Sequence, residues 1–173
     1  PRGKSGKELK PTPVKEAALT MGLPVYTPIK LNTPEAIAEL RALKPDLLVV
    51  VAYGQILNEE VLQTASLGAI NIHASLLPFY RGAAPIQRAL MNGEHESGVT
   101  IMYLDKGMDT GDMILRQSLP LDDNETFGTL HDKLCELGAN LLLEALPLIE
   151  ASTAPRTAQN HGLATYAPKL SRE

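Results

Sequence analysis

Apolar residues follow two different spacings along this chain, and each spacing predicts a different kind of element. Leu47 to Ala52 is continuously apolar, which is typical of a strand buried on both faces of a sheet. Thr126 to Ile149 carries apolar residues at helical spacing and predicts a long amphipathic helix, with a break near Gly138 as an alternative. Further strands are expected at 24–27, 69–73, 98–104 and 113–119, and further helices at 13–20, 33–43, 58–62 and 84–92.

Proline, threonine and glycine mark the ends of several of these helices. Thr33 stands directly before Pro34, which suits an N-cap followed by the first helical position. Pro13 suits the start of the first helix, and Asn92-Gly93 suits the end of the fourth. Because strands alternate with helices, the pattern predicts an α/β fold with a mostly parallel sheet and helices on both faces.

Composition narrows the class of protein. The chain has 173 residues, of which 44% are hydrophobic, enough for one domain with a core. Cys135 is its only cysteine, which excludes a disulfide framework and a cysteine-based zinc site. No apolar run is long enough to span a membrane, so a cytoplasmic protein is expected.

Charge is unevenly distributed. The net charge is −4, yet residues 1–15 hold five basic residues and one acidic residue, so the remainder is clearly acidic. A basic arm on an acidic body favours one anionic partner rather than a generally basic surface. Two alternatives stay open, a solvated basic loop and a non-catalytic nucleic-acid-binding module.

The end of the 69–73 strand carries candidate chemistry. Residues two apart in a strand share a face, so Asn71 and His73 point to one side and Ile70 and Ile72 to the other. In open parallel sheets, ligands bind at the carboxyl ends of strands. An amide donor beside a titratable imidazole suits acyl transfer. The alternative is a buried pair that only satisfies a loop.

An acidic cluster, 105–112, follows the 98–104 strand. If that strand lies parallel beside 69–73, its carboxyl end falls near His73, and Asp109 could orient the imidazole. An aspartic-protease site would need a second such carboxylate, and a calcium loop would need a glutamate where Arg116 stands. A plain turn is the remaining alternative.

Four segments resemble the formyltransferases that use 10-formyltetrahydrofolate. They are 71–78, 80–87, 98–102 and 108–112. Within that family, 81–88, 165–171 and the basic stretch before Pro11 are most similar to the members that formylate initiator methionyl-tRNA. The resemblance implies a Rossmann-like fold and transfer of a formyl group from the folate to the α-amine of methionyl-tRNA. A formyltransferase acting on a sugar nucleotide or another small amine is the alternative.

The resemblance also implies roles for individual residues. It implies a catalytic trio of Asn71, His73 and Asp109, and no metal. Folate contacts are implied for Gln55, Ile56, Leu57, Ser75, Leu76, Leu77, Pro78, Asp105 and Met108. Contacts with tRNA are implied for Arg2, Lys4 and Lys7.

The resemblance also has consequences for the domain organisation. The resemblance implies a catalytic domain at 1–152 that lacks the family's first strand, helix and strand. A linker at 153–173 would lead toward an absent carboxyl-terminal domain. Without the first strand, 47–52 would present an unpaired apolar edge. A strand-exchanged dimer, or a separate chain that supplies the missing strands, would cover it.

Overall fold

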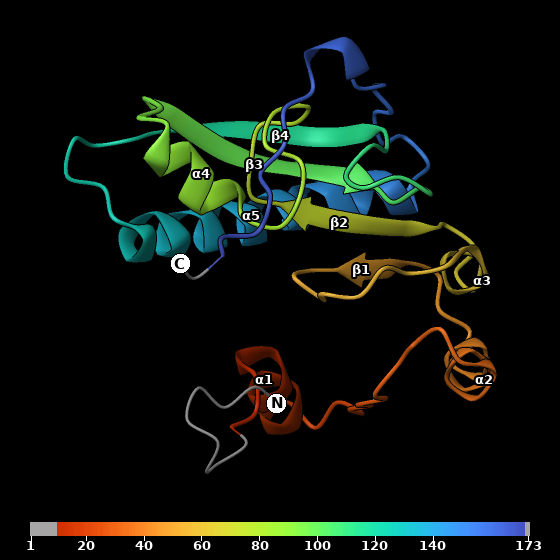
Figure 1. The fold of residues 1–173 in the computed structure, drawn as a ribbon. Helices are drawn as coiled ribbons and strands as arrows, with labels where there is room; N and C mark the ends of the chain where they lie inside the picture. The colour runs from red at the N-terminus through yellow and green to blue at the C-terminus, as the bar shows by residue number, and fades with distance from the viewer. Residues whose placement is uncertain (1–9, 172–173) are drawn as a thin grey trace. The chain divides into compact units, whose positions relative to one another are not determined.

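The computed structural model describes residues 10–171 (Figure 1). The chain divides into two compact units, Pro1–Leu31 and Asn32–Glu173. The first contains α1 (Pro13–Thr20). The second contains, in order, α2 (Pro34–Ala42), β1 (Leu48–Val50), α3 (Glu59–Leu62), β2 (Ala69–His73), α4 (Pro85–Met91), β3 (Glu96–Tyr103), β4 (Met113–Pro120), α5 (Phe127–Glu150) and a 3-10 turn (His161–Leu163).

The five predicted helices are all present, and their caps explain where they begin. The hydroxyl of Thr33 accepts a hydrogen bond from the amide of Ala36, as predicted for the start of α2. At the start of α5, Thr126 and Thr129 form a reciprocal capping box. The strand expected at 24–27 is wrong, because residues 23–28 are not in a strand.

The four strands lie in the order β1-β2-β3-β4. β1 is parallel to β2, with Val50 opposite Asn71, whereas β2 with β3 and β3 with β4 are antiparallel. The α/β class is confirmed, but the described sheet is mixed rather than mostly parallel. The short connection at 104–112 explains why β3 and β4 are antiparallel, because a parallel pair needs a longer crossover than this hairpin provides.

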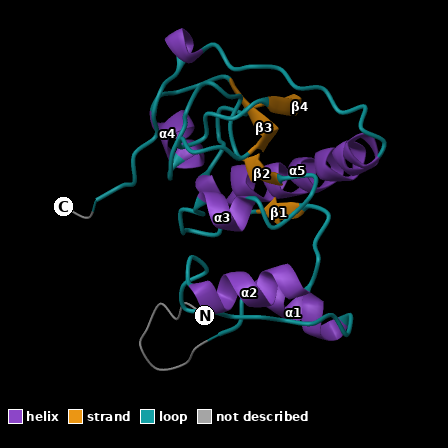
Figure 2. Cartoon of the chain, turned by 90° about the vertical axis from the view of Figure 1, so that its right-hand side faces the viewer, coloured by secondary structure: helices purple, strands orange, loops and turns teal. Residues whose placement is uncertain are grey.

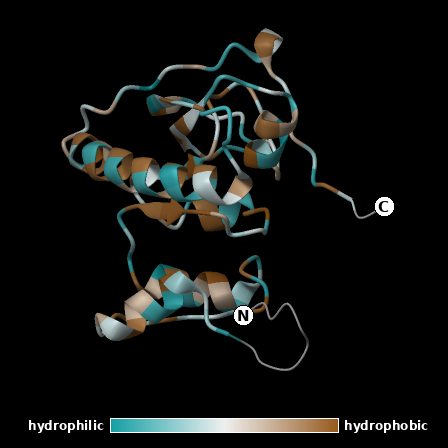
Figure 3. Cartoon of the chain, turned by 90° about the vertical axis from the view of Figure 1, so that its left-hand side faces the viewer, coloured by the Kyte–Doolittle hydropathy of each residue, from teal (hydrophilic) through white to brown (hydrophobic). Residues whose placement is uncertain are grey.

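α5 covers one face of the sheet (Figure 2). Its apolar side, which includes Leu130, Leu134 and Leu141, packs with Ile70 and Ile101 in the core. Figure 3 shows apolar and polar residues along the whole of this helix, as an amphipathic pattern requires.

The break considered at Gly138 does not occur. A side chain at that position would meet Ile72 Cγ2 at 3.1 Å, so the glycine lets α5 approach the sheet closely.

Loops rather than a helix cover the opposite face around Thr100. The amide of Leu77 donates to the Thr100 hydroxyl, which in turn donates to the carbonyl of Ser75. The polar groups of this loop are satisfied by the sheet itself, so this part of the face is closed without a helix. Helices on both faces of the whole sheet stay a prediction.

β1 is shorter and more exposed than its sequence predicts. It spans only Leu48–Val50, and Val49 and Val51 are 42% and 52% exposed. β1 pairs with β2 on one side only among the described residues. The prediction of burial on both faces is therefore wrong for the chain as described.

The segment that follows α5 lies back on the second unit. Thr157 bridges to Met113, Tyr166 bridges to Arg81, and Ala167 is fully buried. The division into a catalytic domain at 1–152 and a linker at 153–173 stays a prediction. Residues 157–167 are packed against the rest of the second unit. No helix within residues 10–171 has the length and apolarity that crossing a membrane requires.

Candidate functional site

Asn71 and His73 lie on the face of β2 that is turned away from α5. Ile70 and Ile72 pack against the helix side, which confirms the predicted division of the strand into two faces. Asn71 is half-buried, and its side chain has no hydrogen-bond partner among residues 10–171. Its amide is therefore available to a ligand.

The imidazole of His73 is buried and held from one side. Its Nε2 lies 2.8 Å from the carbonyl oxygen of Tyr80. Because a carbonyl only accepts, Nε2 carries the hydrogen of this bond. Nδ1 is then the nitrogen that can gain or release a proton, and it lies 3.7 Å from Asp109 Oδ2.

Tyr80, which holds His73, is itself fixed at both ends. Its amide donates to the Thr165 hydroxyl at 2.9 Å, and its own hydroxyl donates to Glu94. Burial, and then the hydrogen bond to the Glu94 carboxylate, raise the pKa of the Tyr80 phenol above its ordinary value. The carbonyl that orients His73 is thus part of a well-anchored turn.

The structure brings Asp109 next to His73, as the sequence predicts, but not through parallel pairing. Tyr103 lies opposite Ile70 at the far end of β2, so the 104–112 loop must fold back to reach His73. Gly111 permits this return, because a side chain there would overlap the Tyr103 carbonyl oxygen. Asp109 Oδ2 also accepts a hydrogen bond of 2.7 Å from the amide of Gly82.

The predicted folate loop at 75–78 is mostly buried. The Ser75 hydroxyl donates to the carbonyl of Phe79 at 2.6 Å. Leu77 is fully buried, and its carbonyl accepts from Arg116 at 2.8 Å. Pro78 is buried as well, and Leu76 packs against Gly98. These contacts brace the loop, and the backbone of Ser75 and Leu77 is hydrogen-bonded to Thr100, which lies opposite His73.

The other predicted folate residues lie on two loops, at exposed positions except for the half-buried Leu57. Gln55, Ile56 and Leu57 follow β1, and parallel strands end at the same edge, so this loop begins beside Asn71. Ile56 is 88% exposed and Met108 is 60% exposed. Asp105 Oδ1 accepts from the amide of Gly107 and from the Thr110 hydroxyl, which shapes the 105–110 turn. Their contact with folate stays a prediction.

The predicted tRNA contacts and the expected absence of a metal are not tested by the described residues. Arg2, Lys4 and Lys7 lie outside the described residues. Within residues 10–171, no group of three or more His, Cys, Asp or Glu side chains is placed to hold a metal ion. The absence of a metal requirement stays a prediction.

Sequence reasoning missed a residue that contacts the site, Gln159. Its side-chain amide donates to the carbonyls of Asp109 and Gly111 at 2.9 and 2.8 Å. It also accepts from the buried guanidinium of Arg81. Gln159 lies in the polar segment predicted as a linker, where only the neighbouring 165–171 similarity hinted at a structural role.

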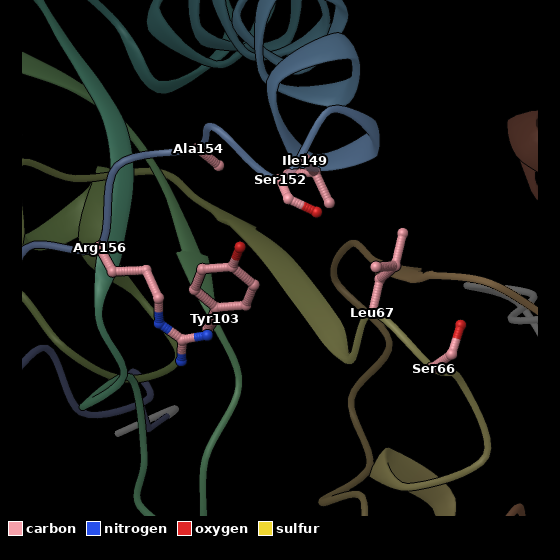
Figure 4. Close-up of a pocket in the computed structure, with 7 residues that line it drawn as sticks. All are labelled: Ser66, Leu67, Tyr103, Ile149, Ser152, Ala154 and Arg156. Atoms are coloured by element: carbon pink, nitrogen blue, oxygen red, sulfur yellow. The ribbon is translucent and has the colours of Figure 1, made fainter.

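A pocket of about 300 Å³ lies elsewhere in the second unit (Figure 4). The guanidinium of Arg156 lies 4.0 Å above the Tyr103 ring and contacts Asp112 at 3.4 Å. None of the predicted site residues lines this pocket. Its lining consists of Ser66, Leu67, Tyr103, Ile149, Ser152, Ala154 and Arg156.

Comparison of the sequence with known proteins gives a consistent result. Residues 1–146 match the sequence model of the formyl transferase family. The chain is 52% identical over 99% of its length to a methionyl-tRNA formyltransferase of Clostridioides difficile (strain 630). It is 53% identical over 100% of its length to one of Moorella thermoacetica. It covers 55% of each, so the chain spans about half the length of the curated relatives it matches.

Solved structures share the fold. The formyltransferase PseJ from Anoxybacillus kamchatkensis, in complex with a UDP-linked formamido sugar and tetrahydrofolate, matches with a TM-score of 0.72 and 26% identity. That match covers 90% of this chain and 79% of PseJ. Phosphoribosylglycinamide formyltransferase from Bacillus halodurans matches with a TM-score of 0.67 and 28% identity, over 74% of this chain and 70% of that one.

Proposed function

The chain belongs to the formyl transferase family, and on that basis we propose that it carries a catalytic site that moves a formyl group from 10-formyltetrahydrofolate to the α-amine of initiator methionyl-tRNA. The observation that supports this most is the position of Asn71 and His73 near the carboxyl end of β2, with Asp109 beside His73. His73 Nδ1 and Asp109 Oδ2 are 3.7 Å apart. The Asn71 side-chain amide has no hydrogen-bond partner among the described residues, so it is free to bind a ligand.

Each side chain has a role in this proposal. In the reaction the amine nitrogen bonds to the formyl carbon, and the bond from that carbon to the folate nitrogen breaks. The formyl oxygen gains negative charge on the way, and the Asn71 amide donates to it. His73, protonated at Nδ1, donates to the same oxygen. The Tyr80 carbonyl keeps the other ring nitrogen engaged and the ring oriented.

Asp109 completes the proton balance. The attacking amine loses a proton, and the departing folate nitrogen gains one. Asp109, acting through a water molecule, takes the proton from the amine and returns a proton through the same water to the departing folate nitrogen, so no net proton is gained or lost. The amide of Gly82 holds Asp109 Oδ2 at 2.7 Å, which leaves Oδ1 to make that contact.

The acceptor amine is proposed from the relatives. The relatives with 52% and 53% sequence identity are named methionyl-tRNA formyltransferases, whereas the sequence identity to the formyltransferase PseJ, solved with a formamido sugar, is 26%. Arg2, Lys4 and Lys7 are proposed to contact the tRNA. The residues at 55–57, 75–78, Asp105 and Met108 are proposed to surround the folate. A sugar nucleotide as acceptor is the second candidate, and a cytoplasmic location fits either acceptor.

Binding of a folate distinguishes this proposal from a nucleic-acid-binding module. Folinic acid at about 100 times its dissociation constant should stabilise the folded protein by about 2.7 kcal/mol and raise its melting temperature. The matched control is p-aminobenzoylglutamate, which has the tail of the folate but no pterin. A melting temperature that responds equally to both compounds, or to neither, would contradict the proposed folate site.

A further inference from the structure

Asp109 has an unusual backbone conformation that something must hold. Its φ is +55°, in the left-handed region that residues with a side chain rarely adopt. The loop around it is also tightly folded, because a side chain at Gly111 would overlap the Tyr103 carbonyl oxygen. Contacts with neighbouring groups can stabilise a loop in this conformation.

Gln159 uses its whole side-chain amide to fix that loop. Its nitrogen donates both hydrogens, one to the carbonyl of Asp109 at 2.9 Å and one to the carbonyl of Gly111 at 2.8 Å. A primary amide has two donors, so both are engaged. Gln159 is only 4% exposed, so water does not compete for these bonds.

The oxygen of the same amide is held by a buried arginine. Arg81 is 2% exposed, and its Nε and Nη2 lie 3.2 and 2.8 Å from Gln159 Oε1. Arg81 Nη2 also lies 2.9 Å from Nδ1 of His161. The backbone of Arg81 pairs with Thr165 and Ala167. The guanidinium therefore orients Gln159 with its nitrogen toward the loop.

The two halves of Asp109 are held through neighbouring residues. Its carboxylate is held by the amide of Gly82, and its carbonyl by Gln159. Gly82 follows Arg81 in sequence, so the same anchored turn supports both contacts. The segment after α5 thus supplies a part of the site that the motifs at 71–78 and 108–112 do not contain.

We propose that Gln159 is a positioning residue for Asp109: its amide nitrogen clamps the 109–111 loop so that the Asp109 carboxylate faces His73. Gln159 touches no reacting atom in this proposal and acts only through Asp109. The kinetic part of the inference rests on the proposed function, whereas the geometric part does not.

Gln159→Glu tests the clamp with a minimal change. The variant keeps an oxygen that accepts from Arg81, so the segment after α5 stays attached. It replaces the nitrogen and its two donated hydrogens with an oxygen that faces the carbonyls of Asp109 and Gly111. The control is Gln117→Glu, the same change on the exposed part of β4, where the side chain has no hydrogen bond among residues 10–171.

The first measurement is hydrogen exchange of the Gly82 amide by NMR, in protein extended to the length of its relatives. This amide donates to Asp109 Oδ2 and so reports the position of the carboxylate. We expect exchange to be at least tenfold faster in Gln159→Glu and unchanged in Gln117→Glu. No substrate is needed, so this result is independent of the proposed function.

The second measurement is formyl transfer by the same proteins. Misplacing a catalytic group by about 1 Å costs up to about 100-fold in rate. We expect kcat of Gln159→Glu to fall 10- to 100-fold while KM changes less than threefold. In the double variant with Asp109→Asn, the Gln159→Glu change should add little further loss, because both act on the same group.

Clear outcomes would overturn the inference. An unchanged rate of hydrogen exchange at the Gly82 amide in folded Gln159→Glu would show that Gln159 only attaches the segment after α5. Faster exchange with unchanged kcat would show that the loop does not need the clamp for the reaction. If Gln159→Glu does not fold, Gln159→Asn, which is neutral but too short to reach both carbonyls, must show the same faster exchange or the proposal fails.

Discussion

Asn71 and His73 are held differently, so single substitutions separate what each contributes. The His73 ring is fixed by the Tyr80 carbonyl, whereas the Asn71 amide has no partner among residues 10–171. In protein extended to the relatives' length, we expect Asn71→Ala and His73→Ala each to lower kcat by about 100-fold or more. The dissociation constant for folate should change much less, because both side chains act on the reacting carbonyl. Steady-state kinetics and calorimetry measure the two quantities.

Matched controls exist for both substitutions. Asn124→Ala and His95→Ala remove the same side chains from exposed positions and should leave kcat within twofold. A near-normal kcat in Asn71→Ala or His73→Ala would assign that residue a structural role only.

The position of a site residue can be predicted from the sequence when it depends only on neighbouring residues in the chain. Asn71 and His73 could be placed on one face because a strand repeats every two residues. Asp109 was placed beside His73 for the wrong reason, since the contact comes from a loop that folds back across an antiparallel pair. Gln159 could not be predicted, because its role depends on contacts with Arg81 and Asp109, which lie about 80 and 50 positions away.

At the scale of elements, the start of α5 contains a pH-sensitive contact. Lys133 Nζ lies 2.8 Å from Glu125 Oε2, and the hydrogen bond from Lys133, followed by that from Thr129, lowers the pKa of Glu125 below 4.5. The same pair raises the pKa of Lys133 above 10.5. Their contribution to stability is therefore present between these values. It is lost as pH falls through the lowered pKa of Glu125 or rises through the raised pKa of Lys133.

Glu125→Gln should therefore lower the melting temperature by a few degrees at pH 7. Below pH 4.5 the difference from the unaltered protein should shrink steadily. Glu136→Gln, on an exposed position of the same helix, should change neither value. Calorimetry over this pH range measures the effect, and a difference that does not vary with pH would exclude the ion pair as its cause.

The basic arm is a second element with a measurable role. Replacing Arg2, Lys4 and Lys7 with Ala should weaken tRNA binding and flatten its dependence on salt, since each phosphate contact releases counterions. The control replaces Arg41, Lys44 and Lys169, which are exposed basic residues of the second unit. Equal salt slopes for the arm variant and the unaltered protein would show that the arm is only a solvated loop.

Helices could be predicted more closely than strands in this chain. The bounds of α5 follow from its own apolar pattern and from the capping residues at its start. β1 is shorter and more exposed than expected, because burial of a strand depends on neighbours that its own residues do not specify. The pairing directions likewise depend on where connections return, which no single run of residues encodes.

At the scale of the whole molecule, we expect the outer edge of β1 to be a surface for association. Val49 and Val51 are about half exposed beside it, and Ile56 is 88% exposed. An apolar unpaired edge recruits another strand. We therefore expect the 173-residue chain alone to be poorly soluble or to sediment as a dimer that exchanges strands. A separate chain that pairs a strand with β1 is the alternative partner.

Charged substitutions at this edge test that expectation. Val49→Lys with Val51→Lys should shift the chain toward monomer in sedimentation. Leu143→Lys, which removes an apolar side chain that is 68% exposed on α5, should not. If the unaltered chain is a stable, soluble monomer, the sheet tolerates the open edge.

The proposed transfer is best followed by tracing the formyl group to its acceptor. Protein extended to the relatives' length would receive 10-formyltetrahydrofolate with a labelled formyl group, methionyl-tRNA and an amino-sugar nucleotide together. We predict label on the α-amine of methionyl-tRNA, and about 100-fold less label in the same time with His73→Ala. Label on the sugar amine alone would exclude methionyl-tRNA as the acceptor, and equal transfer by His73→Ala would exclude His73 as a catalytic residue.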